Sequence, residues 1–75
     1  MSALVEEIRA AKRLPSPAMA RAIRLAADVS QERIAAELGV HRVTVARWEA
    51  GARRPRGQHR AAYAELLRQL QESTS

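Results

Sequence analysis

Three residues divide one part of the chain into two short segments. Ser30 precedes the first segment, Gly39 separates it from the second, and Gly51 follows the second. A serine before a helical segment accepts a hydrogen bond from its first turn, and a glycine after one takes the left-handed conformation that ends a helix. The sequence therefore predicts two short helices, over residues 31–38 and 42–49, joined by a tight turn.

Two helices of this length cannot bury their own apolar faces, so neighbouring helices must complete the core. Apolar residues at helical spacing predict such helices over residues 2–13, 17–27 and 58–71. Ser16 and Pro17 mark the start of the second as N-cap and first helical residue. The residues expected to face the core are Met19, Ala22, Ile23, Leu25, Ala26, Val29, Ile34, Leu38, Val40, Val45, Trp48, Tyr63, Leu66, Leu67 and Leu70.

The composition favours helices over strands. Alanine, leucine and arginine, which favour helix, are abundant, whereas aromatic residues make up only 3% of the chain. We therefore expect an all-α fold, a compact five-helix domain. Residues 1–16 should form an N-terminal amphipathic helix and a proline linker, residues 17–71 the compact domain, and residues 72–75 a frayed tail.

The positive charge of the chain is concentrated in one segment. The net charge is +5, and residues 41–60 alone contain six arginines and one glutamate. Arginine grips phosphate or guanine with two parallel hydrogen bonds, which lysine does not offer. A cationic segment on an otherwise neutral chain indicates either a polyanionic partner, such as a nucleic acid, or a solvated basic loop.

Several function classes find no support in the sequence. The chain has no cysteine, which excludes disulfides and thiolate metal sites. His41 and His59 lack companion ligands, so we expect no metal and no cofactor. No apolar run is long enough for a membrane span or a signal peptide, so we expect a cytoplasmic protein with no membrane partner. The short chain and the lack of paired carboxylates in an apolar setting disfavour an enzyme.

The second short helix has an outward face suited to DNA. With Val45 and Trp48 directed to the core, the outer face carries two arginines and two small apolar residues. Small residues let a helix backbone approach the base edges in the major groove, and arginine forks onto guanine there. The expected base contacts are Arg42, Val43, Ala46 and Arg47.

The motifs in this region resemble those of the phage-repressor and Cro type of helix-turn-helix protein, the XRE family. The resemblance rests on Val29-Ser30-Gln31, on Ala35-Ala36-Glu37-Leu38-Gly39-Val40, on Thr44-Val45-Ala46-Arg47-Trp48-Glu49-Ala50-Gly51 and on Arg54-Pro55. It implies a lambda-repressor-like domain that places residues 42–49 in the major groove. It also implies a structural ion pair between Arg24 and Glu49, and phosphate contacts from Gln31, Thr44, Arg53 and Arg54. We expect two further phosphate contacts, from His41 and Arg56.

Three features depart from the family pattern. His41 stands where a serine or threonine usually caps the recognition helix, and we expect it to act as a cap or as a phosphate contact. Asp28 replaces the usual glycine before the Ser-Gln pair. The last short helices are expected to be fused into one, and an extra helix precedes the domain.

The resemblance implies a sequence-specific regulator of transcription, acting as a repressor by occluding its operator. Because one recognition helix covers only a few base pairs, we expect a homodimer on an inverted-repeat, double-stranded operator. The alternative is a protein-interaction module, such as the antitoxin of a toxin–antitoxin pair. The chain contains no segment that suggests a sensing domain, so we expect no small-molecule ligand.

Overall fold

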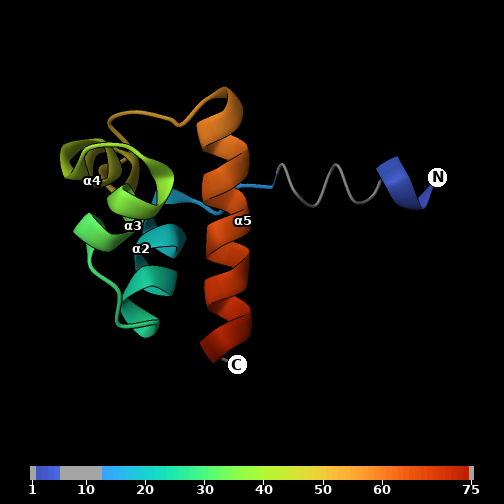
Figure 1. Cartoon of the computed structure of the whole chain (residues 1–75), viewed down its shortest axis with the longest axis horizontal. Coiled ribbons are helices and arrows are strands. Elements are labelled where there is room, and N and C mark those ends of the chain that lie inside the picture. Colours follow the sequence, from blue (N-terminus) through green and yellow to red (C-terminus); the bar gives the residue numbers. More distant parts are fainter. Residues whose placement is uncertain (1, 6–12, 75) are drawn as a thin grey trace.

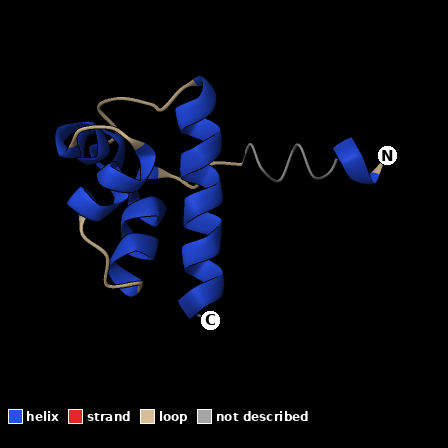
Figure 2. Ribbon diagram, viewed as in Figure 1, coloured by secondary structure: helices blue, strands red, loops and turns tan. Residues whose placement is uncertain are grey.

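The computed structural model describes residues 2–5 and 13–74. The described helices are α2 (Pro17–Ala26), α3 (Gln31–Leu38), α4 (Arg42–Ala50) and α5 (Gly57–Thr74). The described residues contain no strand, which confirms the expected all-α fold (Figure 2). Of the helix predicted over residues 2–13, residues 3–5 are helical, and residues 6–12 lie outside the described part of the chain.

The helix boundaries follow from local capping, as the sequence predicts. The side-chain oxygen of Ser16 accepts a hydrogen bond from the backbone N–H of Met19, and Ser30 does the same for Arg33. Gly39 ends α3 with φ +69°, and Gly51 ends α4 with φ +75°. Both glycines take a left-handed conformation that costs a residue with a Cβ about 1–2 kcal/mol.

The helices α2, α3 and α4 pack into a cluster that lies along one side of α5 (Figure 1). Three buried residues lie at the centre of the core: Ile34 of α3, Val45 of α4 and Leu67 of α5. The ring of Trp48 lies 4.8 Å, centroid to centroid, from the ring of Tyr63. Val29, Leu38, Val40, Leu66 and Leu70 are partly buried against this core.

The buried face of α2 differs from the prediction. Met19 and Leu25 are 51% and 53% exposed, and Ala22 and Ala26 are also exposed, so of the five residues expected inside only Ile23 is buried. The face that packs inward instead carries Ala20, Ile23 and Arg24. The prediction was wrong because it chose the inner face by hydrophobicity, whereas the ion pair of Arg24 with Glu49 places Arg24 inside and Met19 and Leu25 outside.

The end of α5 also differs from the prediction. Helix α5 continues to Thr74, so residues 72–74 are helical where a frayed tail was expected. The hydroxyl groups of Ser73 and Thr74 donate to the carbonyl oxygen of Leu70, at 2.9 and 3.2 Å. Arg68 also forms ion pairs with Glu65 and Glu72 along the helix. These local contacts satisfy groups that a bare helix end leaves unpaired.

Candidate nucleic-acid interface

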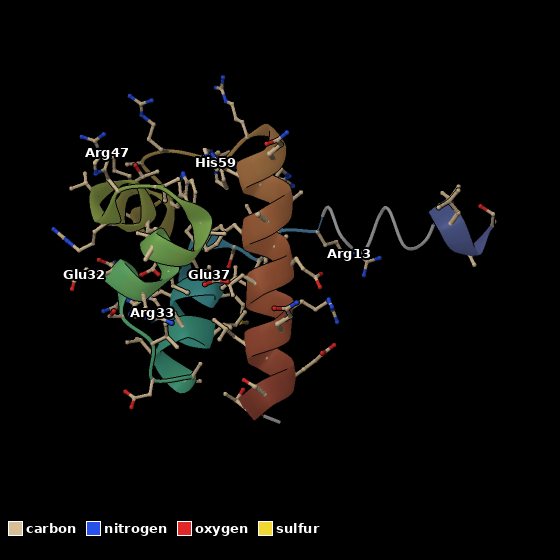
Figure 3. The ribbon with its side chains drawn as sticks, viewed as in Figure 1. Arg13, Glu32, Arg33, Glu37, Arg47 and His59 are labelled. Atoms are coloured by element: carbon tan, nitrogen blue, oxygen red, sulfur yellow. The ribbon has the colours of Figure 1, made fainter. Side chains whose placement is uncertain are left out.

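Helix α4 divides its residues between the core and the solvent. Val45, Trp48 and Glu49 are buried. On the opposite face, Arg42, Val43 and Arg47 are exposed, with Val43 at 46%. The other two predicted contacts on the helix, Thr44 and Ala46, are half-buried beside them. The five predicted DNA contacts of this helix therefore share one surface. Arg47 points outward from it in Figure 3.

The loop after α4 extends this surface. It borders an open hollow of about 760 Å³, lined also by α4 and by the start of α5. All the residues that line the hollow lie in the described part of the chain, and none is acidic. Its basic residues are Arg47, Arg53, Arg54, Arg56, His59 and Arg60.

The charges of the domain are segregated by position. Figure 3 shows Arg47 and His59 at the same end of the molecule, whereas Glu32 and Glu37 lie on α3, away from that end. Several arginines held close together raise the local positive potential and attract a polyanion. No DNA contact was predicted for His59 or Arg60. Arg60 belongs to the cationic segment counted in the sequence, but the position of both residues on the first turn of α5, beside the loop, is a tertiary feature.

Helix α4 begins without a side-chain cap. His41 is its N-cap residue, and it is exposed, but its imidazole makes no capping hydrogen bond. The capping role expected of His41 is therefore absent. The N-termini of α2 and α3 each have a serine cap, so α4 is the one of these three helices whose N-terminus lacks a side-chain cap.

A buried ion pair fixes the far end of α4 to α2. Nε of Arg24 donates to Oε2 of Glu49 at 2.7 Å, and Nη2 donates to Oε1 at 3.0 Å. Nη1 of Arg24 donates to the carbonyl oxygen of Val29 at 2.9 Å. Both charged residues are only 8% exposed. The pair that the family resemblance implied is thus formed, with two parallel hydrogen bonds.

The pKa values of the pair reflect this contact. The hydrogen bond to Glu49 raises the pKa of Arg24 and outweighs the effect of burial. Burial alone would raise the pKa of Glu49, but hydrogen bonds from Arg24 and Gln31 and the charge of Arg24 leave it below its ordinary value. Both groups are therefore charged at neutral pH.

Gln31 connects the ion pair to the outer face of α4. Its Nε2 donates to Oε1 of Glu49 at 3.1 Å, and its Oε1 accepts from Nη1 of Arg42 at 3.3 Å. Both bonds join the first residue of α3 to α4. The contact between Gln31 and Arg42 was not foreseen.

Sites of other kinds are not found in the described residues. They contain no cluster of three or more histidine, cysteine, aspartate or glutamate residues that would hold a metal ion. Among the helices of the same residues, none combines the length and apolar character needed to span a bilayer.

The comparisons with known proteins agree with this geometry. A family model described as helix-turn-helix matches residues 21–71, more than half of the chain. Neither the curated proteins nor the solved structures gave a match. The matched residues contain α3, α4 and their connecting turn, together with most of α2 and α5. The chain therefore belongs to the phage-repressor type of helix-turn-helix proteins, the XRE family, which bind double-stranded DNA and regulate transcription.

Proposed function

We propose that this protein is a sequence-specific repressor of the Cro type, which binds a double-stranded operator and excludes other proteins from it. The observation that carries the proposal is the outer face of α4. Its exposed arginines and small apolar residues lie directly beside a hollow lined by further arginines. Such a face combines groups that recognise bases with groups that bind phosphate.

The base-contacting residues in this proposal are Arg42, Val43, Ala46 and Arg47. Each arginine offers two parallel N–H donors to N7 and O6 of a guanine, and such a pair contributes about 1–3 kcal/mol of discrimination. Val43 and Ala46 offer apolar contact to a thymine methyl group. We therefore expect a half-site with guanines at the positions facing the two arginines.

The phosphate-contacting residues surround that face. Arg53 and Arg54 lie in the exposed loop after α4, level with the DNA backbone when α4 occupies the major groove. Their contacts hold the domain on any sequence and carry no base preference. The full set comprises Gln31, His41, Thr44, Arg53, Arg54 and Arg56.

The protein acts on its operator as a homodimer in this proposal. A single α4 covers only a few base pairs, which is too little for a unique site. Two copies on half-sites about 10 bp apart place both recognition helices on one side of the duplex. We therefore expect an inverted repeat in the operator.

The test begins with selection of bound sites from random duplexes, followed by the stoichiometry of the selected complex. Four alanine variants are then titrated against the selected duplex and a scrambled one at several salt concentrations. Arg42→Ala and Arg47→Ala should each lose about 1–3 kcal/mol on the operator only. Arg53→Ala and Arg54→Ala should weaken binding to both duplexes and reduce the salt slope by about one unit for each phosphate that is no longer neutralised.

Arg33→Ala is the matched control for these variants. It removes the same charge from α3, away from the hollow (Figure 3), and should leave both affinities nearly unchanged. If the loop variants change base preference while the helix variants change only the salt slope, the docked orientation is wrong. A selected site without an inverted repeat, bound by one copy, contradicts the dimer.

A second candidate function is a protein-interaction role, as in the antitoxin of a toxin–antitoxin pair. The observation that favours it is the exposure of large apolar side chains away from α4: Leu4, Val5, Met19 and Leu25. Co-expression with the product of the adjacent gene, followed by size-exclusion chromatography, tests this role. A stable complex that Met19→Ser together with Leu25→Ser disrupts would support it, and separate elution would exclude that partner.

A further inference from the structure

A second, smaller hollow lies where the linker before α2 meets the loop after α4. Its volume is about 230 Å³, and α2, α4 and α5 also contribute to its wall. Two buried aromatic residues, Trp48 and Tyr63, line it. Leu14, Pro17 and Pro55 add further apolar surface. Most of the wall is therefore apolar, with the flat side chains that pack well against a planar ring.

The polar part of this wall is cationic. Arg53 and Arg54 line the hollow, and their side chains are exposed and make no hydrogen bond or ion pair with the described residues. The wall contains no acidic residue, and all of its residues lie in the described part of the chain. A guanidinium without a protein partner can bind a carboxylate through two parallel hydrogen bonds.

Tyr63 gives a second indication that a molecule belongs in this hollow. Its hydroxyl group is buried and has no hydrogen-bond partner among the described residues. Buried polar groups in folded proteins nearly always have a partner, which is water or a ligand when the protein supplies none. An occupant of the hollow that carries an acceptor, or a water molecule bound with it, would complete the hydrogen bonding of this group.

We propose that this hollow binds a small aromatic monocarboxylate, with its ring against Trp48 and its carboxylate on Arg53 and Arg54. The volume lies below the range of about 300–1,000 Å³ that is typical of sites for drug-sized ligands, so the molecule is small. The sequence led us to expect no small-molecule ligand, because it contains no sensing domain. A hollow assembled from the linker, the loop and three helices requires none.

The loop after α4 connects this hollow to the DNA-facing one. Arg53, Arg54 and Pro55 line both hollows. An arginine that holds the carboxylate of a ligand is not available to a DNA phosphate. The ligand should therefore lower the affinity for DNA of any sequence and leave the base preference unchanged. This effect on DNA binding rests on the proposed function, whereas binding of the ligand itself does not.

The first experiment titrates the full chain with 3-phenylpropanoate at constant ionic strength. Trp48 is the single tryptophan of the chain, so its fluorescence reports on the wall of the hollow. We expect a saturable change with a dissociation constant on the order of 1 mM. Acetate lacks the ring and 3-phenylpropanol lacks the charge, and both should bind at least about tenfold more weakly. Equal binding of either control compound overturns the inference.

Two double variants test the position of the carboxylate. Arg53→Gln together with Arg54→Gln should weaken binding of 3-phenylpropanoate on the order of tenfold. The matched control, Arg47→Gln together with Arg56→Gln, removes the same charge from residues that line the DNA-facing hollow only, and should bind normally. If both double variants weaken binding equally, the probe responds to net charge and the proposed site is wrong.

A 1H–15N spectrum tests the location of the probe without any substitution. The backbone amide signals of Ala20 and Tyr63, which line the hollow, should shift as 3-phenylpropanoate is added. The signals of Glu32 and Glu37 on α3 should stay in place, since neither residue lines the hollow. Shifts on α3 without shifts at Ala20 and Tyr63 would overturn the proposed site.

The last experiment measures DNA binding in the presence of the probe. At ten times its dissociation constant, 3-phenylpropanoate should reduce the affinity for the selected and the scrambled duplex alike, on the order of tenfold for each bound copy. The same concentration of 3-phenylpropanol should have no such effect. If the probe occupies the hollow and both affinities stay the same, the competition with DNA is refuted. If the probe binds but no duplex is bound even without it, the proposed function fails while the ligand site stands.

Discussion

Replacing Glu49 by alanine should remove a large part of the stability of the domain. The substitution leaves the guanidinium of Arg24 in place, with side-chain exposure of only 10%. Two of its hydrogen bonds, at 2.7 and 3.0 Å, lose their acceptor. The third, from Nη1 to the carbonyl oxygen of Val29, remains. The variant thus contains a buried positive charge without its carboxylate partner.

The expected loss follows from these hydrogen bonds. Breaking a buried ion pair by removing one partner costs about 3–5 kcal/mol. Because Arg24 keeps its bond to Val29, we expect about 3 kcal/mol. The free energy of unfolding of a domain of this size is roughly 4–11 kcal/mol. The loss corresponds to a decrease of about 12–24 °C in melting temperature.

The assay is urea unfolding of the full chain, monitored by far-UV circular dichroism. A matched control replaces both partners with apolar residues, Arg24→Met together with Glu49→Leu, and should recover most of the stability because no charge is left buried. If Glu49→Ala costs less than about 1 kcal/mol, or if the double variant is as unstable as the single one, the argument from buried charge is refuted.

The ion pair between Arg24 and Glu49 should also make the free energy of unfolding depend on pH in the acid range. The pKa of Glu49 in the folded protein lies below its ordinary value, so the folded state binds fewer protons than the unfolded state near that value. The contribution of Glu49 is therefore complete above the unfolded pKa and is lost as the pH falls through the lower folded pKa. The variant Glu49→Gln should lack this part of the acid-induced loss.

Two further predictions concern the core and the turns. Burial raises the pKa of Tyr63 to about 12, and its hydroxyl group has no partner among the described residues, so stability should decline as the pH rises from about 10 through 12. Tyr63→Phe should abolish that decline in stability, and its melting temperature at neutral pH should be unchanged or higher. A clearly lower melting temperature would show that the hydroxyl group has a partner. Gly39→Ala and Gly51→Ala should each cost about 1–2 kcal/mol in urea unfolding through backbone strain, because an added Cβ meets nothing within 4 Å at the first and only a 3.7 Å contact with Pro17 at the second. Equal stability of these alanine variants and the parent chain would contradict this reasoning.

The helix boundaries were predictable because they depend on short-range chemistry. Ser16, Ser30, Gly39 and Gly51 each act within a few residues of their own position, and the structure places them at the predicted ends. The arginine surface was predictable for a similar reason, since charge counting along the chain needs no tertiary information. These features define most of the fold and of the arginine-rich surface beside α4.

The inner face of α2 and the hydrogen bonds of Gln31 to Glu49 and Arg42 depend on contacts between helices. Hydrophobicity alone places Met19 and Leu25 inside and Arg24 outside. The family resemblance implied the ion pair of Arg24 with Glu49, but the face of α2 that this pair turns inward follows from the packing of α2 against α4. The bond between Arg42 and Gln31 depends on the angle at which α3 crosses α4, which residue spacing does not specify. Asp28 has a φ of +57° in the turn where the family usually has glycine. Aspartate adopts this left-handed conformation more readily than most residues that have a Cβ.

The division of α4 between core and solvent has a consequence for how such proteins diverge. Arg42, Val43 and Arg47 are exposed, whereas the residues that anchor the helix point the other way. Substitutions at exposed positions usually change stability by less than about 0.5 kcal/mol. With the base contacts proposed above, a duplicated copy of the gene can therefore acquire a new operator through changes at Val43 or Arg47 while it continues to fold. A change at Arg42 also alters the partner of Gln31, so new specificities should arise more readily at Val43 and Arg47 than at Arg42.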